Sequence, residues 1–396
     1  MKTKKNPALF FRSGACVVLG LALFLPVAPV LLGASPLLSS RWGFRIDPPE
    51  EYQFSEGDGK NRFSFRSPEG ALLDLVVYAG DTYPSVEAVA EDVQRRLNNR
   101  GEISSFEYRT KKAALMALQF SRPGSGNRAA SQGWGLCIEL EGDTRGNGKP
   151  LLLALAYGPE ERRDLQGVFL SALDSIIPTP LDSHAPGPIT EFSYPRGEQK
   201  QVRLAGGTAE ALIAEHDVEA AQALVDREFA VLRRYAASPL WQEAWTRFYR
   251  AIYRDSFDRL ANAAFALERY WNTQESENRK LAEKALGWVQ SFTYERDFMG
   301  SDFVNLVSAA VEGRGDCDSR ALLWAIMLEQ ANIPAAIMVS RDYSHAMGLA
   351  DLPGTGARFD LQNKQWLVAE TTAPVALGLI GQSVSDISNW LGVVFE

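Results

Sequence analysis

The chain of 396 residues has few of the side chains that bind transition metals, with three histidines and three cysteines. His184 lies among prolines, and His216 lies between Glu215 and Asp217, where we expect a solvated surface position. Neither has a second histidine or cysteine beside it at the spacing of zinc ligands. No acidic loop with the spacing of a calcium site occurs toward the C-terminus. We therefore expect neither a metal nor another cofactor.

Basic surface is also scarce. The formal net charge is -8 and the isoelectric point is near 5.2. No run of lysine and arginine with interleaved aromatic residues is present, so we exclude nucleic acid as a partner. Hydrophobic residues make up 46% of the chain and charged residues 23%, which is typical of a folded globular protein. The length exceeds that of one compact core and predicts two or three folding units.

Charge is absent from residues 14–34, an apolar stretch that follows a basic N-terminus. This order predicts an export signal over residues 1–40. The stretch is long enough to span a bilayer, so the segment is either cleaved, with Ala34 as a candidate position, or kept as a membrane anchor. We expect the rest of the chain outside the cytoplasm, in the periplasm or extracellular space or anchored to the membrane.

Export changes the interpretation of the cysteines, because oxidising compartments favour disulfides. Only Cys137 and Cys317 follow the signal segment. They could pair with each other, or Cys137 could be a packing residue in a strand-like run while Cys317 stays free. We favour the second arrangement because the residues around Cys317 suggest a role of its own.

Residues 42–177 have the pattern of an α+β domain. Strand-like runs lie at 62–66, 72–78, 113–120, 134–140 and 151–157. Helical spacing interrupts them at 85–100 and 159–176. These elements predict an antiparallel sheet with helices on one face. Their order resembles, in shape alone, the small α+β sandwich of the PsbP/Mog1 type.

A proline-rich stretch at 178–207 predicts a linker. Helical spacing then dominates residues 208–286. We predict helices over 209–214, 218–236, 241–270 and 279–290. The aromatic residues at helical spacing in these segments favour core packing over a ligand site.

The last region, 287–396, has the pattern helix, loop, helix and then several strands. A loop with two glycines leads into residues 317–330, whose apolar residues recur at helical spacing. Asp316 is placed to cap this helix, which puts Cys317 in its first turn. Unpaired N–H groups and the helix dipole favour a thiolate there. The negative charges of Asp316 and Asp318 disfavour the thiolate unless their carboxylates face the cap and Arg320.

Strands are predicted at 335–339, 345–350, 357–361 and 366–371. If the second pairs antiparallel with the last, His345 lies across from Glu370. Directly opposed side chains are about 5 Å apart at Cβ, which allows a carboxylate to hold an imidazole nitrogen.

These segments resemble the transglutaminase-like superfamily of papain-like cysteine enzymes over about residues 285–375. Its Gly-Asp-Cys-x-Ser/Asp-x-Ala helix start is similar to Gly315-Asp-Cys-Asp-Ser-Arg-Ala321. Its His-Ala strand is similar to His345-Ala346, and its Trp-x-x-x-Asp-x-Thr strand to Trp366-Leu-Val-Ala-Glu-Thr-Thr372. The resemblance implies a papain-like core in which a helix packs on an antiparallel sheet.

The resemblance also implies roles for single residues. Cys317 would be the nucleophile, His345 the general base and acid, and Glu370 the orienting carboxylate, in place of the usual aspartate. The Cys317 backbone N–H and a donor from Gln290 or Tyr294 would stabilise an oxyanion.

The implied chemistry is thiolate attack on the amide carbonyl of a peptide or protein, followed by a thioester that water or an amine resolves. We expect an exported or anchored cysteine peptidase or amidase, with hydrolysis favoured over cross-linking. The alternative is a catalytically inactive module that binds peptides or proteins in the cell envelope. Glu370 and the two acids that flank Cys317 support that alternative.

Overall fold

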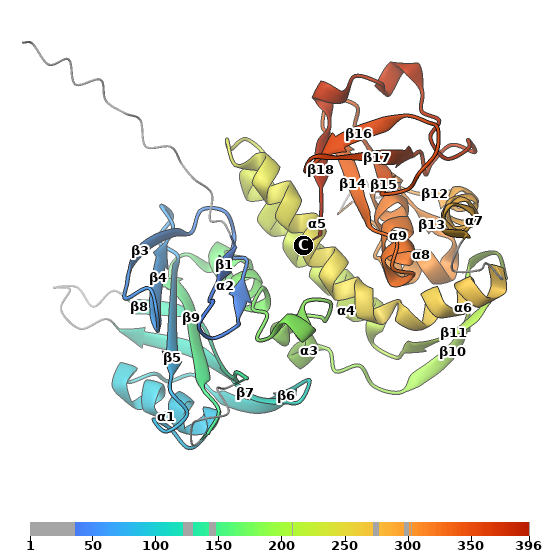
Figure 1. Cartoon of the computed structure of the whole chain (residues 1–396). Coiled ribbons are helices and arrows are strands. Elements are labelled where there is room, and N and C mark those ends of the chain that lie inside the picture. Colours follow the sequence, from blue (N-terminus) through green and yellow to red (C-terminus); the bar gives the residue numbers. More distant parts are fainter. Residues whose placement is uncertain are drawn as a thin grey trace, which may run out of the picture. The chain divides into compact units, whose positions relative to one another are not determined.

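The computed structural model describes residues 36–121, 130–141, 148–207, 209–271, 277–296, 301 and 303–395. The expected export signal lies outside these residues up to position 35. In the described part of the chain, no helix combines the length and apolar character needed to cross a bilayer. The described residues from position 36 onward belong to a single unit of the α+β class, whose helices and strands are labelled in Figure 1.

A seven-stranded antiparallel sheet forms the first part of this unit, with the order β3-β4-β5-β9-β8-β7-β6. A short pair, β1 (Leu37–Leu38) and β2 (Arg45–Ile46), precedes it. Its strands are β3 (Gln53–Gly57), β4 (Arg62–Arg66), β5 (Leu72–Tyr78), β6 (Ile103–Tyr108), β7 (Lys111–Ser121), β8 (Ala130–Glu139) and β9 (Leu151–Pro159). The sequence predicted the bounds of β4 and β5 and the positions of β7, β8 and β9.

Helices cover both faces of this sheet, so the prediction of helices on one face was wrong. Helix α1 (Val86–Leu97) packs on one face and α2 (Gln166–Asp174) on the other, after the turn η1 (Arg163–Leu165). Successive residues of β8 show the two faces, because Cys137 belongs to the α1 core and Leu136 to the α2 core. The central strands are apolar on both sides, and such strands need cover on both.

The stretch 178–207, predicted as a linker, contains regular structure held by α2. It contains η2 (Pro180–Asp182) and the short helix α3 (Pro188–Ser193). The Asp174 carboxylate accepts hydrogen bonds from the backbone N–H groups of Ile189 and Thr190, at 2.8 and 2.9 Å, and so caps α3. Proline spacing alone does not reveal this cap.

Strand β10 (Gln199–Arg203) follows and pairs antiparallel with β11 (Glu210–Ala214). The sequence predicted a helix over 209–214, and that prediction was wrong. Ala211 and Ile213 are buried while Glu210 and Leu212 are exposed, a period of two that the short apolar run concealed.

Helices then follow in series. They are α4 (Asp217–Leu232), η4 (Arg233–Tyr235), α5 (Trp241–Arg259), α6 (Ala261–Trp271) and α7 (Asn278–Gln290). The segment 241–270, predicted as one helix, is two helices that meet at Leu260. Phe248 and Ile252 of α5 are buried in the core, as the spacing predicted.

A five-stranded antiparallel sheet closes the chain, with the order β16-β17-β15-β14-β18. Its strands are β14 (Ala335–Ser340), β15 (His345–Ala350), β16 (Arg358–Leu361), β17 (Lys364–Ala369) and β18 (Leu391–Val393). The elements before the sheet are β12 (Thr293–Tyr294), α8 (Leu306–Glu312), β13 (Arg314–Gly315) and α9 (Cys317–Gln330). The turns η6 (Gln382–Val384) and η7 (Ile387–Asn389) precede β18.

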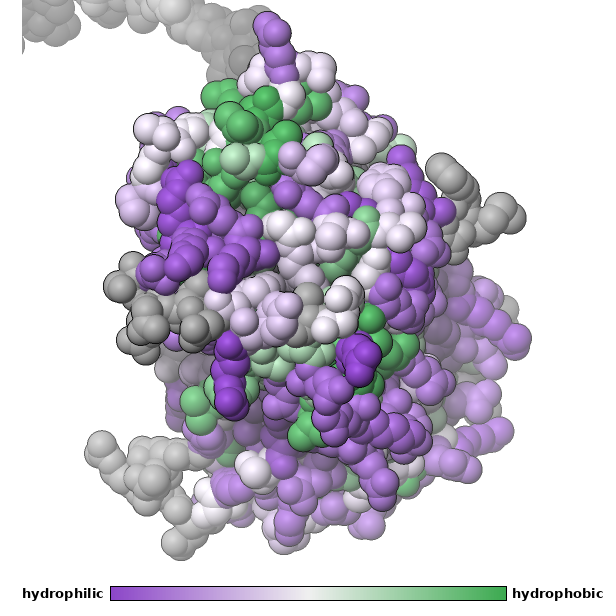
Figure 2. Space-filling model, turned by 90° about the vertical axis from the view of Figure 1, so that its right-hand side faces the viewer, coloured by the Kyte–Doolittle hydropathy of each residue, from purple (hydrophilic) through white to green (hydrophobic). Residues whose placement is uncertain are grey.

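Helix α9 packs on one face of this sheet and carries the buried indole of Trp324 onto β15. A Cβ atom at Gly348 would lie 2.4 Å from the Trp324 ring, so only glycine allows this approach. The other face is covered by a cluster that includes Trp390. Figure 2 shows one side of the molecule, where hydrophilic side chains predominate and hydrophobic areas are interspersed.

Candidate active site

Cys317 is the first residue of α9, and a complete cap fixes its position. The Asp316 carboxylate accepts hydrogen bonds from the Ser319 backbone N–H at 2.8 Å and from the Ser319 hydroxyl at 2.6 Å. The same hydroxyl accepts a hydrogen bond from the Val304 N–H at 3.0 Å. The helix therefore starts where the sequence predicted, with the nucleophile candidate at its positive end.

The segment after α7 is held beside the loop that precedes Cys317. Strands β12 and β13 pair in parallel, with Tyr294 in register with Gly315. Arg320 donates hydrogen bonds to the carbonyls of Gly315 and Phe292, at 3.1 and 2.7 Å, and its guanidinium lies 5.4 Å from the Tyr294 ring centroid. The Tyr294 hydroxyl consequently reaches Cys317 and makes a hydrogen bond with it.

His345 opens β15, and its Nε2 lies 2.8 Å from Oε2 of Glu370. The sequence predicted that the two residues would lie directly across from each other. In the structure β15 and β17 pair Gly348 with Ala369, and the same register continued by one residue opposes Glu370 to Met347. The contact is therefore diagonal, a separation of about 7–8 Å between backbones that a long side chain can bridge.

The Glu370 carboxylate is fixed on its other oxygen as well. Its Oε1 accepts hydrogen bonds from the Thr372 backbone N–H at 2.8 Å and from the Thr372 hydroxyl at 2.6 Å. Burial acts to raise the pKa of Glu370, but the hydrogen bond and charge of His345 and the Thr372 donors outweigh it and lower the pKa. The carboxylate is thus ionised at neutral pH and aligned on the imidazole.

The sulfur of Cys317 lies at the start of β15. The backbone N–H of Ala346, the residue after His345, hydrogen-bonds to it. The thiol in turn points at Asp318, with 3.9 Å between Sγ and Oδ1. The side chain is 5% exposed, so access to it is narrow. These contacts place the thiol next to the residue that carries the imidazole.

Burial, and after it the charges of Asp318 and Asp316, raise the pKa of the Cys317 thiol. From the sequence, we expect the helix terminus to lower the thiol pKa if both acids face the cap and Arg320. Asp316 does face the cap. The Asp318 carboxylate instead faces the sulfur and makes a hydrogen bond with the side chain of Tyr249 of α5. The resting thiol is therefore protonated near neutral pH.

Gln290 and Tyr294, the two candidates for an oxyanion donor, occupy different positions. The Gln290 amide nitrogen donates to the carbonyls of Glu370 and Val375, at 2.8 and 2.9 Å, and so holds the chain after β17. Tyr294 contacts the sulfur directly, and burial followed by the Cys317 charge raises the pKa of Tyr294 to about 12. Its hydroxyl keeps its proton and can donate it in a hydrogen bond.

Sequence reasoning missed three contributors to this site. Thr372 belongs to the quoted Trp-to-Thr strand motif, which was the signal available for it. Tyr249 and Trp390 had no such signal, since they come from α5 and from the segment before β18. The Trp390 ring lies 6.1 Å from the His345 ring at 63° and limits its movement.

Cys137 and Cys317 are both free thiols. They belong to separate hydrophobic cores, because Cys137 of β8 lies in the core under α1 and Cys317 lies in the core to which α9 belongs. Across the described ranges, no three histidine, cysteine, aspartate or glutamate side chains gather in a way that could hold a metal ion.

No protein-family model matches the chain, and no curated protein matches it. Solved structures with some similarity include LpqN, described as involved in cell envelope biogenesis of Mycobacterium tuberculosis. That match has 12% identity and a TM-score of 0.27, and it covers 37% of this chain and 90% of LpqN. A protein from Bacteroides thetaiotaomicron matches with 12% identity and a TM-score of 0.26, over 58% of this chain and 79% of that one. Similarity this low carries no information about function.

Proposed function

We propose that the C-terminal part of the chain is a transglutaminase-like cysteine enzyme that acts on amide bonds of peptides or proteins. The observation that carries the proposal is the 2.8 Å contact between His345 and Glu370 beside a sulfur that accepts the Ala346 N–H. A nucleophile, a base and a group that orients the base are the three parts that such chemistry needs.

In the proposed reaction the thiol is activated as it attacks. Glu370 engages Nε2, so Nδ1 of His345 is the nitrogen left to take the proton from Cys317. A C–S bond forms to the amide carbonyl carbon, and the oxyanion is stabilised by the Cys317 backbone N–H and the Tyr294 hydroxyl. The C–N bond then breaks, and His345 returns its proton to the leaving amine.

The thioester is resolved in a second step. Water attacks the carbonyl carbon while His345 takes its proton, the C–S bond breaks, and the proton returns to sulfur. We favour water over an amine, so the activity is that of a peptidase or amidase. The basic and apolar N-terminal segment supports export, which places the substrate among peptides and proteins of the cell envelope or outside the cell.

A second candidate is a binding module that kept the fold without the activity. The buried thiol beside Asp318 favours it, because these surroundings hold the proton on sulfur. In this case the surface beside Cys317 would bind a peptide without cleaving it.

One experiment separates the two candidates. The purified chain is mixed with p-nitrophenyl acetate, which acylates reactive cysteines whatever their natural substrate. If the chain is the proposed enzyme, we expect a burst of nitrophenolate, and mass spectrometry should find the acetyl group on Cys317. The burst disappears in Cys317→Ala and slows by about 100-fold or more in His345→Ala. A wild-type chain with no burst, or with equal rates in wild type and His345→Ala, shows that the enzymatic proposal is wrong.

A further inference from the structure

A cavity of about 520 Å³ lies away from the proposed active site and includes none of Cys317, His345 and Glu370. It borders Glu329 near the end of α9, twelve residues beyond Cys317 and therefore roughly 18 Å along the helix from the sulfur. Pockets for small organic molecules have volumes of about 300–1,000 Å³. The cavity thus has the size of a ligand site that is separate from the catalytic chemistry.

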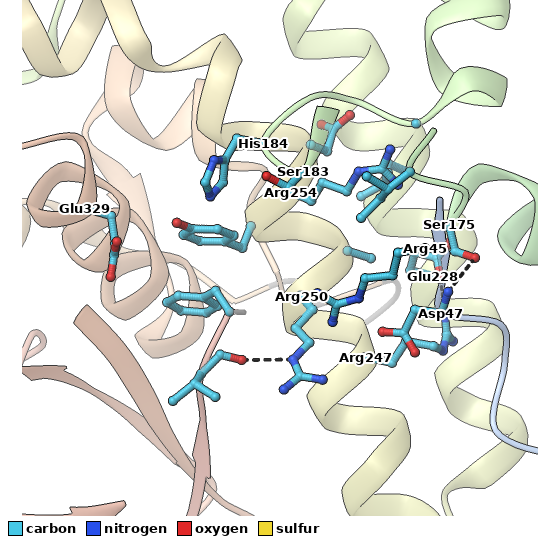
Figure 3. A pocket seen from close by; sticks show the side chains of 18 of the residues that line it. Arg45, Asp47, Ser175, Ser183, His184, Glu228, Arg247, Arg250, Arg254 and Glu329 are labelled. Atoms are coloured by element: carbon cyan, nitrogen blue, oxygen red, sulfur yellow. Dashed lines mark hydrogen bonds and ion pairs between the residues drawn. The ribbon is translucent and has the colours of Figure 1, made fainter. Parts of the chain in front are cut away.

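Arginines form one side of this cavity. Arg247, Arg250 and Arg254 line it from one face of α5, and Arg45 lines it from β2 (Figure 3). Residues three and four apart on a helix are neighbours, so the three α5 guanidinium groups lie in a row. Burial lowers the pKa of Arg250, and the positive charge of Arg45 acts in the same direction.

Most acidic side chains of the lining already have partners. Asp174 and Glu228 are paired with Arg227 at 2.5 and 2.8 Å. The remaining paired acids are Asp255, bound to Arg259 at 2.9 Å, and Glu329, which accepts the Ala335 N–H at 2.6 Å.

Asp47 is the acid that faces the arginine row, near Arg247, Arg250 and Arg45. Burial raises the pKa of Asp47, while the three arginines act to lower it. Because five arginines and Lys364 stand against five acids in the lining, the cavity keeps an excess of positive charge.

Several arginine N–H groups in this row have no acceptor within the described residues. Arg250 uses Nε for the Val394 carbonyl, at 2.9 Å, and has no further hydrogen bond there. The Arg45 side chain has none. Arg247 Nη2 and Arg254 Nε are buried and have no hydrogen-bond partner among the described residues, and the Arg247 side chain is only 5% exposed. Buried donors of this kind are rarely left unsatisfied, so they indicate a missing acceptor.

The opposite side of the cavity is aromatic. Tyr253 and Phe395 stack with their ring centroids 4.1 Å apart and their planes at 5°. Trp366 also lines the cavity. A ligand that fits both sides has an anionic head and an apolar or aromatic body.

We propose that this cavity binds a small organic oxyanion, a phosphate monoester or a carboxylate, whose head is held by Arg45 and Arg250 and whose body lies against Tyr253 and Phe395. Guanidinium groups match both head groups through paired N–H donors. A phosphate monoester and a carboxylate share this binding chemistry, and binding assays distinguish between them.

The test is calorimetric titration of the full chain with phenyl phosphate, with 3-phenylpropionate and with inorganic phosphate. We expect saturable binding of phenyl phosphate or 3-phenylpropionate, and the tighter of the two identifies the head group. Inorganic phosphate should bind more weakly, because it lacks the body that contacts the aromatic pair. If neither aromatic probe binds, or if inorganic phosphate binds as tightly as both, the proposed site is wrong.

Variants connect binding to the named arginines. Arg250→Gln and Arg45→Gln should each lower the affinity for the tighter-binding probe about 10- to 100-fold. Arg269→Gln on α6 makes the same change of charge outside the cavity and should leave binding unchanged. Arg250→Lys should restore part of the affinity, which excludes a folding defect. Equal affinity in Arg250→Gln, Arg45→Gln and wild type contradicts the proposal, whereas Cys317→Ser should bind normally whether or not the chain is an enzyme.

Discussion

At the scale of single residues, the geometry of Glu370 accounts for a longer acid at the position where the motif that this segment resembles has aspartate. The strand register offsets the carboxylate from His345 by two residues, and the added methylene spans that offset. Thr372 then fixes the second oxygen, so the extra rotational freedom of glutamate is removed.

We predict that Glu370→Asp separates the carboxylate from the imidazole. The acylation burst with p-nitrophenyl acetate should slow by about tenfold or more, because an imidazole without its partner is misaligned. Glu283→Asp, the same change at a half-exposed position of α7, should leave the burst unchanged. A Glu370→Asp chain with wild-type kinetics would show that the 2.8 Å contact has no catalytic role.

Asp318 gives a prediction about pH. Its negative charge beside the sulfur helps raise the pKa of Cys317, so Asp318→Asn should lower that pKa and give more thiolate at any given pH. Iodoacetamide labelling of Cys317, followed by mass spectrometry, should therefore shift to lower pH in the variant. The control is Asp351→Asn, an exposed acid outside the site. Identical labelling profiles in Asp318→Asn and wild type would rule out this electrostatic control.

At the scale of elements, the distance between α9 and β15 sets the geometry of the site. Cys317 lies at the tip of the helix and His345 at the tip of the strand, and the two elements touch where Trp324 packs on Gly348. A change in this contact moves both candidate catalytic residues relative to each other.

We predict that Gly348→Ala lowers the free energy of unfolding by about 1–3 kcal/mol, because the buried indole cannot move aside for a Cβ atom. Gly287→Ala is the matched control, since residue 287 is an exposed position of helix α7 with nothing within 4 Å and should stabilise by about 0.5–1 kcal/mol. Urea unfolding followed by circular dichroism measures both. Equal effects of the two substitutions would contradict the close approach.

Elements with a long or regular pattern could be predicted from the sequence, and contacts between them could not. The bounds of α9 and β15 followed from Asp316, from the apolar spacing and from the turn before His345. Strand β11 was missed because five residues are too few to separate a period of two from a helical period. Register, the second covered face of the first sheet and the approach of Tyr249 to Asp318 all depend on tertiary packing, which no local pattern encodes.

At the scale of the whole described chain, buried charges join residues that are far apart in sequence. Arg247 of α5 donates hydrogen bonds to Glu50 and Glu228, at 2.8 and 2.7 Å, and to the Ser171 hydroxyl at 2.9 Å. These partners precede the first sheet or belong to α4 and α2. The network therefore ties the first α+β region to the helices that support the candidate active site.

Removing the centre of this network should destabilise the protein strongly. We predict that Arg247→Ala lowers the free energy of unfolding by about 3–5 kcal/mol, because the buried Glu50 carboxylate loses its partner and Glu228 keeps only Arg227. The exposed arginine of β10, in Arg203→Ala, should change it by less than about 0.5 kcal/mol. Thermal and urea unfolding provide the measurement, and a loss as small as that of the control would show that the network is not a stabilising unit.

The acid beside the sulfur also has a consequence for how the thiol would react with oxidants in the proposed exported setting. Peroxides attack the thiolate of cysteine and react slowly with the protonated form. A thiol that Asp318 and burial keep protonated is consequently protected from conversion to sulfenic acid while no substrate is bound. The same feature that slows the proposed nucleophile would thus preserve it in an oxidising environment.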